Sequence, residues 1–558
     1  MFRTLFLAGA LLAAPVHADG TAGPYLAARI AGFSNDYRAA GDYYSRLMRR
    51  QDVNTEIVES AIIIFSVLGR FDDAVDAAET LDEETQPSQF ARAAQMITAL
   101  RDGRLADAQA LLDDGGVGGA LLDGLLTAWI AAADGETARA LAAFDTLAET
   151  EGFAPFAWTH KAYALAMAGD FEGADDILSG RAHGPLPANA RAIAAHAQVL
   201  SQLEQPEVAL DLLQKATAVS NSPVLEDLEA RISAGEQVFY DMVATPQDGM
   251  AEAYFTLAAL LAGESSTTFT LLNARGATVL RPDHVDALIL VADLLESQDQ
   301  HDLANAALTA VPREHPVFFA AELARAEVLL SSDREEAAIE VLQSLTRSRA
   351  ERKEVWAAYA DALRRLDRHS QAVEAYDRAI ALDGGAESEN WFWIYARGIS
   401  RERTGNWAGA EADFRRALEL NPEQPNVLNY LGYGLVEQRI KLDEALDLIE
   451  RAVAARPDDG YITDSLGWAL YRLGRFEEAV EPMERAVMLR PLDPLINDHL
   501  GDVLWQVDRK REARFQWRRA LSLEPEEQVE RIKRKLEVGL DVVLEEEGGI
   551  GAIEAAQD

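Results

Sequence analysis

Apolar residues recur along most of this chain at the spacing of an α-helix, and no stretch alternates apolar and polar residues as a half-buried strand does. The residues after Pro525 show this pattern well, because Val529, Ile532, Leu536 and Leu540 fall three or four positions apart. Turn residues interrupt the helical stretches at short intervals, as in "LGRFDDAVDAA" and "AGDFEGADDIL". The pattern predicts an all-α protein of short helices joined by tight turns.

A period of 34 or 35 residues organises the stretch from residue 391 to residue 525. Three positions in each period hold the same residue type in four successive copies, and one globular core does not produce four copies in phase. The period therefore predicts a stacked-repeat protein. The copies are Gly398, Gly432, Gly467 and Gly501; Ala417, Ala452, Ala486 and Ala520; and Pro422, Pro457, Pro491 and Pro525.

This pattern resembles the tetratricopeptide repeat (TPR), in which each repeat is a helix, a tight turn and a second helix. One clear copy reads "YITDSLGWALYRLGRFEEAVEPMERAVMLRP". In this copy Gly474 suits the left-handed position that ends the first helix, and Pro491 stops the second helix. The resemblance implies an all-α fold, a right-handed TPR superhelix (α-solenoid) of about fourteen helical hairpins.

The regularity of the repeats varies along the chain and predicts its organisation. The irregular connector is interpreted either as a boundary, and so a hinge, between two superhelical blocks or as a long loop within one solenoid. A helix after the last repeat is expected to cover the final apolar face of the array. The predicted segments are a signal peptide at 1–18, degenerate TPR-like repeats at 19–235, an irregular connector at 236–250, TPR-like repeats at 251–390, well-formed TPR repeats at 391–525, a capping helix at 526–546 and a disordered tail at 547–558.

The first residues, MFRTLFLAGALLAAPVHADG, combine a positive start at Arg3, a short apolar run and a small-residue site ending at Ala18. These features indicate a secretory signal peptide, since the apolar run is far shorter than the roughly 20 residues of a membrane-spanning helix. The chain has no Cys, which excludes disulfides, thiolate metal sites and a lipid-modified N-terminal Cys. We expect a periplasmic protein without direct membrane insertion.

The formal net charge of −41 over 558 residues further restricts the expected partners. A surface this acidic repels phosphate, so nucleic acid and anionic membranes are disfavoured. Other proteins, as peptide segments or helices, are the expected partners, and the oligomeric state is left open.

The sequence contains no recognisable catalytic, nucleotide-binding or calcium-binding motif. The His residues lie mostly in different repeats and never at i and i+4, so no metal site is predicted. We expect a non-catalytic protein without a cofactor.

In TPR families, positions 2, 5, 9, 12 and 13 of the first helix face the concave groove. Several aromatic residues and an Arg fall at these positions here, and these residue types dominate binding hot spots. The alternative is that the same aromatics fill the core between helices. The resemblance predicts a protein-binding groove that includes Phe392, Tyr395, Asn426, Asn429, Tyr433, Tyr461, Asp464, Trp468, Tyr471, Arg472, Asp498 and Trp505.

The C-terminal end of the repeats is locally basic, in contrast to the rest of the chain. This segment is either an electrostatic docking face or a set of side chains that pair with neighbouring acids. The basic residues are Arg509, Lys510, Arg511, Arg514, Arg518, Arg519, Arg531, Lys533, Arg534 and Lys535.

These observations predict a periplasmic scaffold or adaptor that binds other proteins through its groove. The segments "LNYLGYGLVEQ" and "NDHLGDVLWQVDRKREARFQW" also resemble adaptors of carboxy-terminal-processing proteases, which implies a role in envelope protein quality control. An assembly factor for envelope or polysaccharide export machinery is an alternative. A third hypothesis is an enzyme subunit with catalytic groups in the groove.

Overall fold

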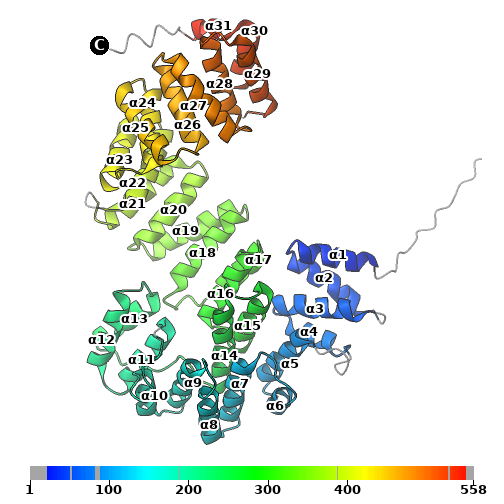
Figure 1. The fold of residues 1–558 in the computed structure, drawn as a ribbon. Coiled ribbons are helices and arrows are strands. Elements are labelled where there is room, and N and C mark those ends of the chain that lie inside the picture. The colour runs from blue at the N-terminus through cyan, green and yellow to red at the C-terminus, as the bar shows by residue number, and fades with distance from the viewer. Residues whose placement is uncertain are drawn as a thin grey trace, which may run out of the picture. The chain divides into compact units, whose positions relative to one another are not determined.

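The computed structural model describes residues 22–50, 53–81, 88–187, 189–385, 388–525 and 528–547. Within these residues the protein contains 31 helices and no strand, so the prediction of an all-α superhelix of helical hairpins is confirmed (Figure 1). The predicted signal peptide at 1–18 and the tail from residue 548 onward lie outside the described residues. The chain divides into two compact units, unit 1 up to Ala338 and unit 2 from Ile339.

Unit 1 contains the following helices: α1 (Ala22–Phe33), α2 (Tyr37–Met48), α3 (Thr55–Val67), α4 (Phe71–Ala78), α5 (Gln89–Arg101), α6 (Leu105–Asp113), α7 (Ala120–Ala133), α8 (Thr137–Ala148), α9 (Ala154–Met167), α10 (Phe171–Leu178), α11 (Ala190–Gln202), α12 (Pro206–Thr217), α13 (Pro223–Ser233), α14 (Pro246–Leu261), α15 (Thr267–Leu280), α16 (Val285–Glu296), α17 (His301–Thr309) and α18 (Phe318–Ser331). The division falls within α19 (Glu335–Ser348).

Unit 2 contains α20 (Lys353–Arg365), α21 (His369–Leu382), α22 (Trp391–Arg403), α23 (Trp407–Leu420), α24 (Pro425–Glu437), α25 (Leu442–Ala455), α26 (Gly460–Arg472), α27 (Phe476–Leu489), α28 (Pro494–Gln506), α29 (Lys510–Ser522), α30 (Val529–Val538) and α31 (Leu540–Glu546).

The α26–α27 hairpin shows how the local sequence specifies each repeat. The Asp459 side chain caps α26 by accepting from the backbone N–H groups of Tyr461 and Ile462. Gly474 ends the turn after α26 with φ of +74°, a conformation that a side chain disfavours. A Cβ on Gly467 would lie 2.6 Å from Cγ of Met483, so the two helices require glycine at their contact.

A ladder of arginines connects successive repeats of unit 2. The guanidinium groups of Arg451, Arg485 and Arg519 lie 34 residues apart and donate to the carbonyl oxygens of prolines in the preceding inter-repeat turns. These prolines cannot continue a helix, which leaves their carbonyl groups free to accept. The N···O distances are 3.3 Å to Pro422, 2.8 Å to Pro457 and 2.9 Å to Pro491.

Unit 1 departs from a simple sequential stack after α13. Helices α1 to α12 form hairpins in chain order, and then residues 234–245 carry the chain back toward earlier hairpins. Helix α14 packs against α5, α7 and α9, while α15 packs against α3 and α5 (Figure 1). These partners are the first helices of their hairpins, whose exposed sides line the groove of a helical repeat array. The α14–α15 hairpin therefore fills the inner face of the N-terminal repeats.

The connector is an extended segment that side chains of α11 hold in place. The Val238 N–H donates to Ser201 Oγ at 2.9 Å, and the amide of Gln202 donates to the Val238 carbonyl at 2.7 Å. The amide of Gln198 donates to Asp241 at 2.7 Å and accepts from its backbone N–H at 3.2 Å. The connector thus lies inside unit 1, and Pro246 opens α14 at a position where proline is favoured.

A glycine permits the closest approach of α14 to the N-terminal repeats. A Cβ on Gly249 would lie 2.3 Å from Cδ2 of Trp129, and the Trp129 side chain is fully buried in α7. The indole ring has no free space to move into, since protein interiors are close-packed.

We predict that Gly249→Ala lowers the free energy of unfolding by about 1–3 kcal/mol, because overpacking outweighs the gain in helix propensity. Thermal and urea denaturation measure the effect. Gly32→Ala is the matched control, because a Cβ there meets nothing within 4 Å, and it should leave stability unchanged or slightly raised. Equal stability of the Gly249→Ala variant and the wild type would contradict the close packing of α14 on α7.

Candidate functional site

The predicted groove residues differ strongly in their exposure to solvent. Phe392 and Tyr461 are 42% and 52% exposed. Asn426, Asn429, Tyr433 and Arg472 are half-buried. The others are buried by neighbouring helices, and these are Tyr395, Asp464, Trp468, Tyr471, Asp498 and Trp505. The exposed members define the part of this surface that a partner can reach without rearrangement.

Trp468 lies at the centre of a stack of three rings in unit 2. Its ring is 4.8 Å from that of Tyr471 and 4.0 Å from that of His499, and both pairs are nearly parallel. Its indole N–H donates to Glu437 at 2.9 Å. These contacts join α24, α26 and α28, so Trp468 and Tyr471 act in packing between repeats whatever else they do.

A buried ion pair lies below this stack. Asp464 accepts from Nδ1 of His499 at 3.0 Å, and both side chains are buried. Burial alone would lower the pKa of His499, but the charge of Asp464 and the hydrogen bond to it together raise this pKa. The arrangement holds α26 against α28.

The C-terminal helix neutralises two acidic groups on α28. Lys535 of α30 is fully buried, and its ammonium group lies 2.7 Å from Asp498 and 2.6 Å from Asp502. The indole N–H of Trp517 also donates to Asp502 at 2.9 Å. Lys535 therefore fixes the capping helix through charge as well as through apolar contact.

An exposed row of side chains remains along the N-terminal ends of α22, α24 and α26. The guanidinium of Arg490 lies over the ring of Tyr461 at 4.9 Å from its centre, a cation–π contact. Arg456 donates to the side chain of Asn426 at 3.2 Å. Together with Phe392, these residues form what we call the exposed row: Phe392, Asn426, Arg456, Tyr461 and Arg490.

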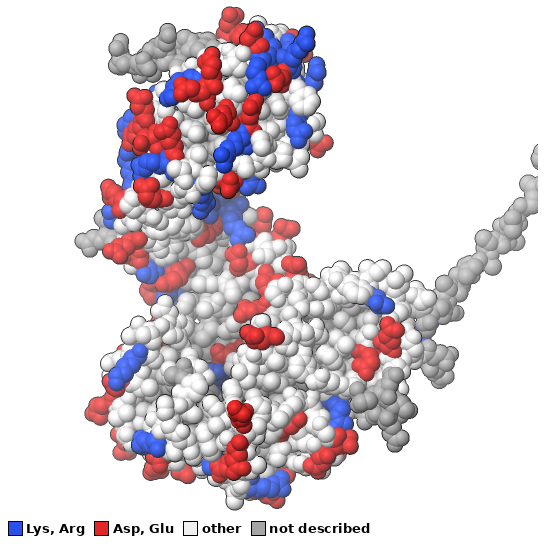
Figure 2. Space-filling model, viewed as in Figure 1, with Lys and Arg blue, Asp and Glu red and all other residues white. Residues whose placement is uncertain are grey.

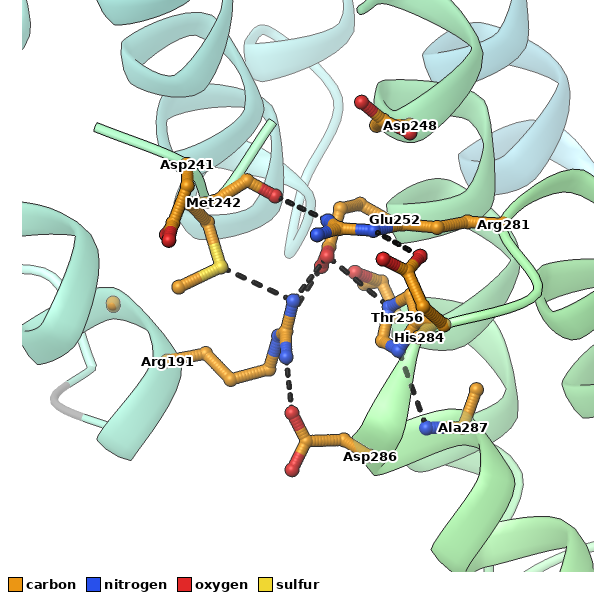
Figure 3. Close-up of polar contacts among 12 residues, drawn as sticks. Arg191, Asp241, Met242, Asp248, Glu252, Thr256, Arg281, His284, Asp286 and Ala287 are labelled. Atoms are coloured by element: carbon orange, nitrogen blue, oxygen red, sulfur yellow. Dashed lines mark hydrogen bonds and ion pairs between the residues drawn. The ribbon is translucent and has the colours of Figure 1, made fainter. Parts of the chain in front are cut away.

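Unit 1 contains a second polar cluster, centred on Arg191 of α11 (Figure 3). Figure 3 shows the guanidinium of Arg191 directed at Glu252, Asp286 and the sulfur of Met242, and it forms ion pairs with both carboxylates. Nε2 of His284 lies 3.1 Å from Glu252, and Arg281 donates to the Met242 carbonyl at 2.7 Å. The cluster joins α11, the connector, α14 and α16.

The carboxylate of Glu252 is the most buried acid in this cluster. Burial alone would raise its pKa, but the positive charge of Arg191 and the contact with His284 hold the pKa well below its ordinary value. Glu252 therefore stays ionised, and Arg191 supplies the opposite charge. The role that follows is to hold the α14–α15 hairpin in the inner face of unit 1.

His160 of α9 joins this hairpin by a separate contact. Its Nδ1 accepts from the Trp129 indole N–H at 3.0 Å, which assigns the proton to Nε2, and Nε2 then donates to Thr256 of α14 at 3.1 Å. Burial lowers the pKa of His160 to about 4. Sequence reasoning did not single out His160, Arg191 or Glu252, because their partners lie about 30 to 100 positions away in the chain.

The described residues contain no group of three or more His, Asp or Glu side chains placed to hold a metal ion. Over the same residues, no helix combines the length and the apolar character needed to cross a membrane.

Comparisons with known proteins bear on the repeat family. Residues 377–526 and 323–387 match two family models that are both described as tetratricopeptide repeat. The chain is 30% identical over 162 residues to the TPR repeat-containing protein PA4667 of Pseudomonas aeruginosa, a match that covers 28% of this chain and 26% of that protein. The resemblance to tetratricopeptide repeats is confirmed over residues 323–526.

Two further similarities are more distant. The general transcriptional corepressor ssn6 of Schizosaccharomyces pombe is 28% identical over 171 residues, which cover 28% of this chain and 15% of that protein. A solved tetratricopeptide repeat protein from Parabacteroides merdae is 17% identical, with 46% of this chain and 98% of that chain covered and a TM-score of 0.38. The chain thus spans about a quarter of the Pseudomonas relative and less of the yeast relative.

We predict that acid weakens unit 1 through His160. The folded-state pKa of about 4 lies below the ordinary 6.5, so the unfolded chain binds this proton first and stability falls as the pH drops below about 6.5. Between about pH 7.5 and pH 5, this group should account for a loss of about 2 kcal/mol in the free energy of unfolding. Urea denaturation at several pH values should show a loss smaller by that amount in His160→Gln, and an identical pH profile would contradict the assignment.

We also predict that Lys535→Met lowers the free energy of unfolding of unit 2 by about 3–5 kcal/mol, since two carboxylates would stay buried without their cation. Urea denaturation followed by tryptophan fluorescence measures this loss. Adding Asp502→Asn to Lys535→Met should restore part of the stability, because one buried charge is then removed. Wild-type stability in Lys535→Met would contradict the proposed role of this ion pair.

Proposed function

We propose that this protein is an exported scaffold that holds partner proteins on the exposed row of unit 2. The observation that carries this proposal is the contrast between two inner faces. In unit 1 the protein's own α14–α15 hairpin fills the face formed by α3, α5, α7 and α9. In unit 2 the described helices follow one another in chain order, and Phe392 and Tyr461 are exposed to solvent.

The composition of the exposed row suits protein binding. Phe392 and Tyr461 supply apolar area with few rotatable bonds, and Arg456 and Arg490 supply donors beside them. Neither arginine forms an ion pair among the described residues, so both can bind acceptor groups of a partner. The tetratricopeptide repeats at 323–526 support a protein-binding role of this kind.

The proposed location is the periplasm, on the basis of the signal-peptide features of residues 1–18. Within the envelope we propose a role in protein quality control, as an adaptor that presents proteins to a carboxy-terminal-processing protease. The resemblance of "LNYLGYGLVEQ" and "NDHLGDVLWQVDRKREARFQW" to such adaptors supports this role.

The test is capture of partners by the tagged full-length chain in intact cells, with fractionation of the same cells. We predict that Phe392→Ala with Tyr461→Ala reduces capture by about tenfold or more, since exposed aromatics of this kind contribute most at interfaces. Thermal stability should stay within about 0.5 kcal/mol of wild type, because both side chains are exposed.

Phe239→Ala is the matched control, since Phe239 of unit 1 is also a largely exposed aromatic, and it should leave capture unchanged. Equal capture by the double variant and the wild type would overturn the assignment of the exposed row. Recovery of the tagged chain in the cytoplasmic fraction would overturn the proposed location.

A further inference from the structure

The outer surface of the last repeat differs from those of the two repeats before it. Three outward positions on the second helix of each hairpin recur 34 residues apart, and all nine side chains are exposed. They are acidic in two successive repeats and then change to Arg, Phe and Arg. The sets are Asp443, Asp447 and Glu450 on α25; Glu477, Glu481 and Glu484 on α27; and Arg511, Phe515 and Arg518 on α29.

Most of the basic side chains around α29 and α30 have partners. Eight of the ten predicted basic residues form an ion pair or donate to a backbone carbonyl. Arg511 and Arg518 form neither kind of contact among the described residues. Figure 2 shows Lys and Arg side chains gathering over the helices at the C-terminal end of unit 2. The pairing interpretation thus accounts for most of this basic segment but not for these two arginines.

The local energetics of α29 do not explain Arg511 or Phe515. Arg511 lies in the first turn of the helix, where the helix dipole disfavours a cation, whereas α25 and α27 carry Asp443 and Glu477 at the equivalent position. Phe515 is 62% exposed, on the same side of α29 as both arginines by its i+4 spacing from Arg511. A helix that breaks local preferences without a compensating contact is a candidate for an external one.

We propose that Arg511, Phe515 and Arg518 form a docking surface for an acidic segment of a partner protein with an apolar side chain between its carboxylates. Charge complementarity selects this partner, because two unpaired arginines flank one exposed aromatic over about 10 Å of helix. A flat anionic membrane fits less well, since it would also meet the acidic surfaces of α25 and α27. This surface is separate from the exposed row, so the two proposals can fail independently.

The experiment measures fluorescence anisotropy of a short fluorescein-labelled peptide with glutamates on both sides of a central Leu-Trp pair. The full chain should bind this peptide at low salt, and should bind the version with Gln in place of each Glu at least about tenfold more weakly. The triple variant R511E, F515E, R518E should weaken binding by a similar factor. It places the acidic character of α27 on α29 at exposed positions, so it should fold, which circular dichroism and thermal denaturation verify.

The variant E477Q, E481Q on α27 is the matched control and should bind at least as tightly as wild type. Equal affinity for the Glu and Gln peptides, or equal binding by the triple variant, would overturn the proposal. Binding to phosphatidylglycerol vesicles without binding to the Glu peptide would also overturn it. A monomer–dimer shift that depends on Arg511 and Arg518, without peptide binding, would assign the surface to a second copy and overturn it as well.

Discussion

The structure depends on one packing constraint: the first helix of each hairpin has a side that its own repeat does not cover. In unit 1 the chain covers this side itself, because α14 and α15 return to the inner face formed by α3, α5, α7 and α9. This return is possible because Gly249 lets α14 lie directly against the buried ring of Trp129. An inner face filled in this way is a hydrophobic core rather than a binding groove, which leaves partner binding to unit 2.

Buried charges fix the segments that close each unit. Arg191 of α11 pairs with Glu252 of α14 and Asp286 of α16, and Lys535 of α30 pairs with Asp498 and Asp502 of α28. In both places a segment that arrives late in the chain meets buried charge from an earlier helix. Apolar contact alone tolerates many positions of a docked helix, whereas a buried ion pair penalises every position that separates its partners. The same geometry accounts for the specificity of both closures.

The repeat period of the sequence was sufficient to predict the all-α class, the hairpins and the capping helix, because Gly, Ala and Pro report local constraints such as those at Gly467 and Gly474. The return of α14 was not predictable, since "MAEAYFTLAALLAG" has the pattern of any repeat helix and its partners lie far away in the chain. For the groove, the position rule could not distinguish Trp468, buried by His499 and Tyr471, from the exposed Tyr461. Asp498 and Asp502, four residues apart on one helix, did signal that a cation was needed, but not that Lys535 supplies it.

Hydrogen–deuterium exchange of the full chain tests the closure of unit 1 most directly. If α14 and α15 fill the inner face, their amides should exchange as slowly as those of α7, because opening the hairpin exposes the core of the unit. Exchange of α14 and α15 at the faster rate of a peripheral helix such as α1 would show that the hairpin leaves this face readily. That result would contradict the assignment of a filled inner face to unit 1.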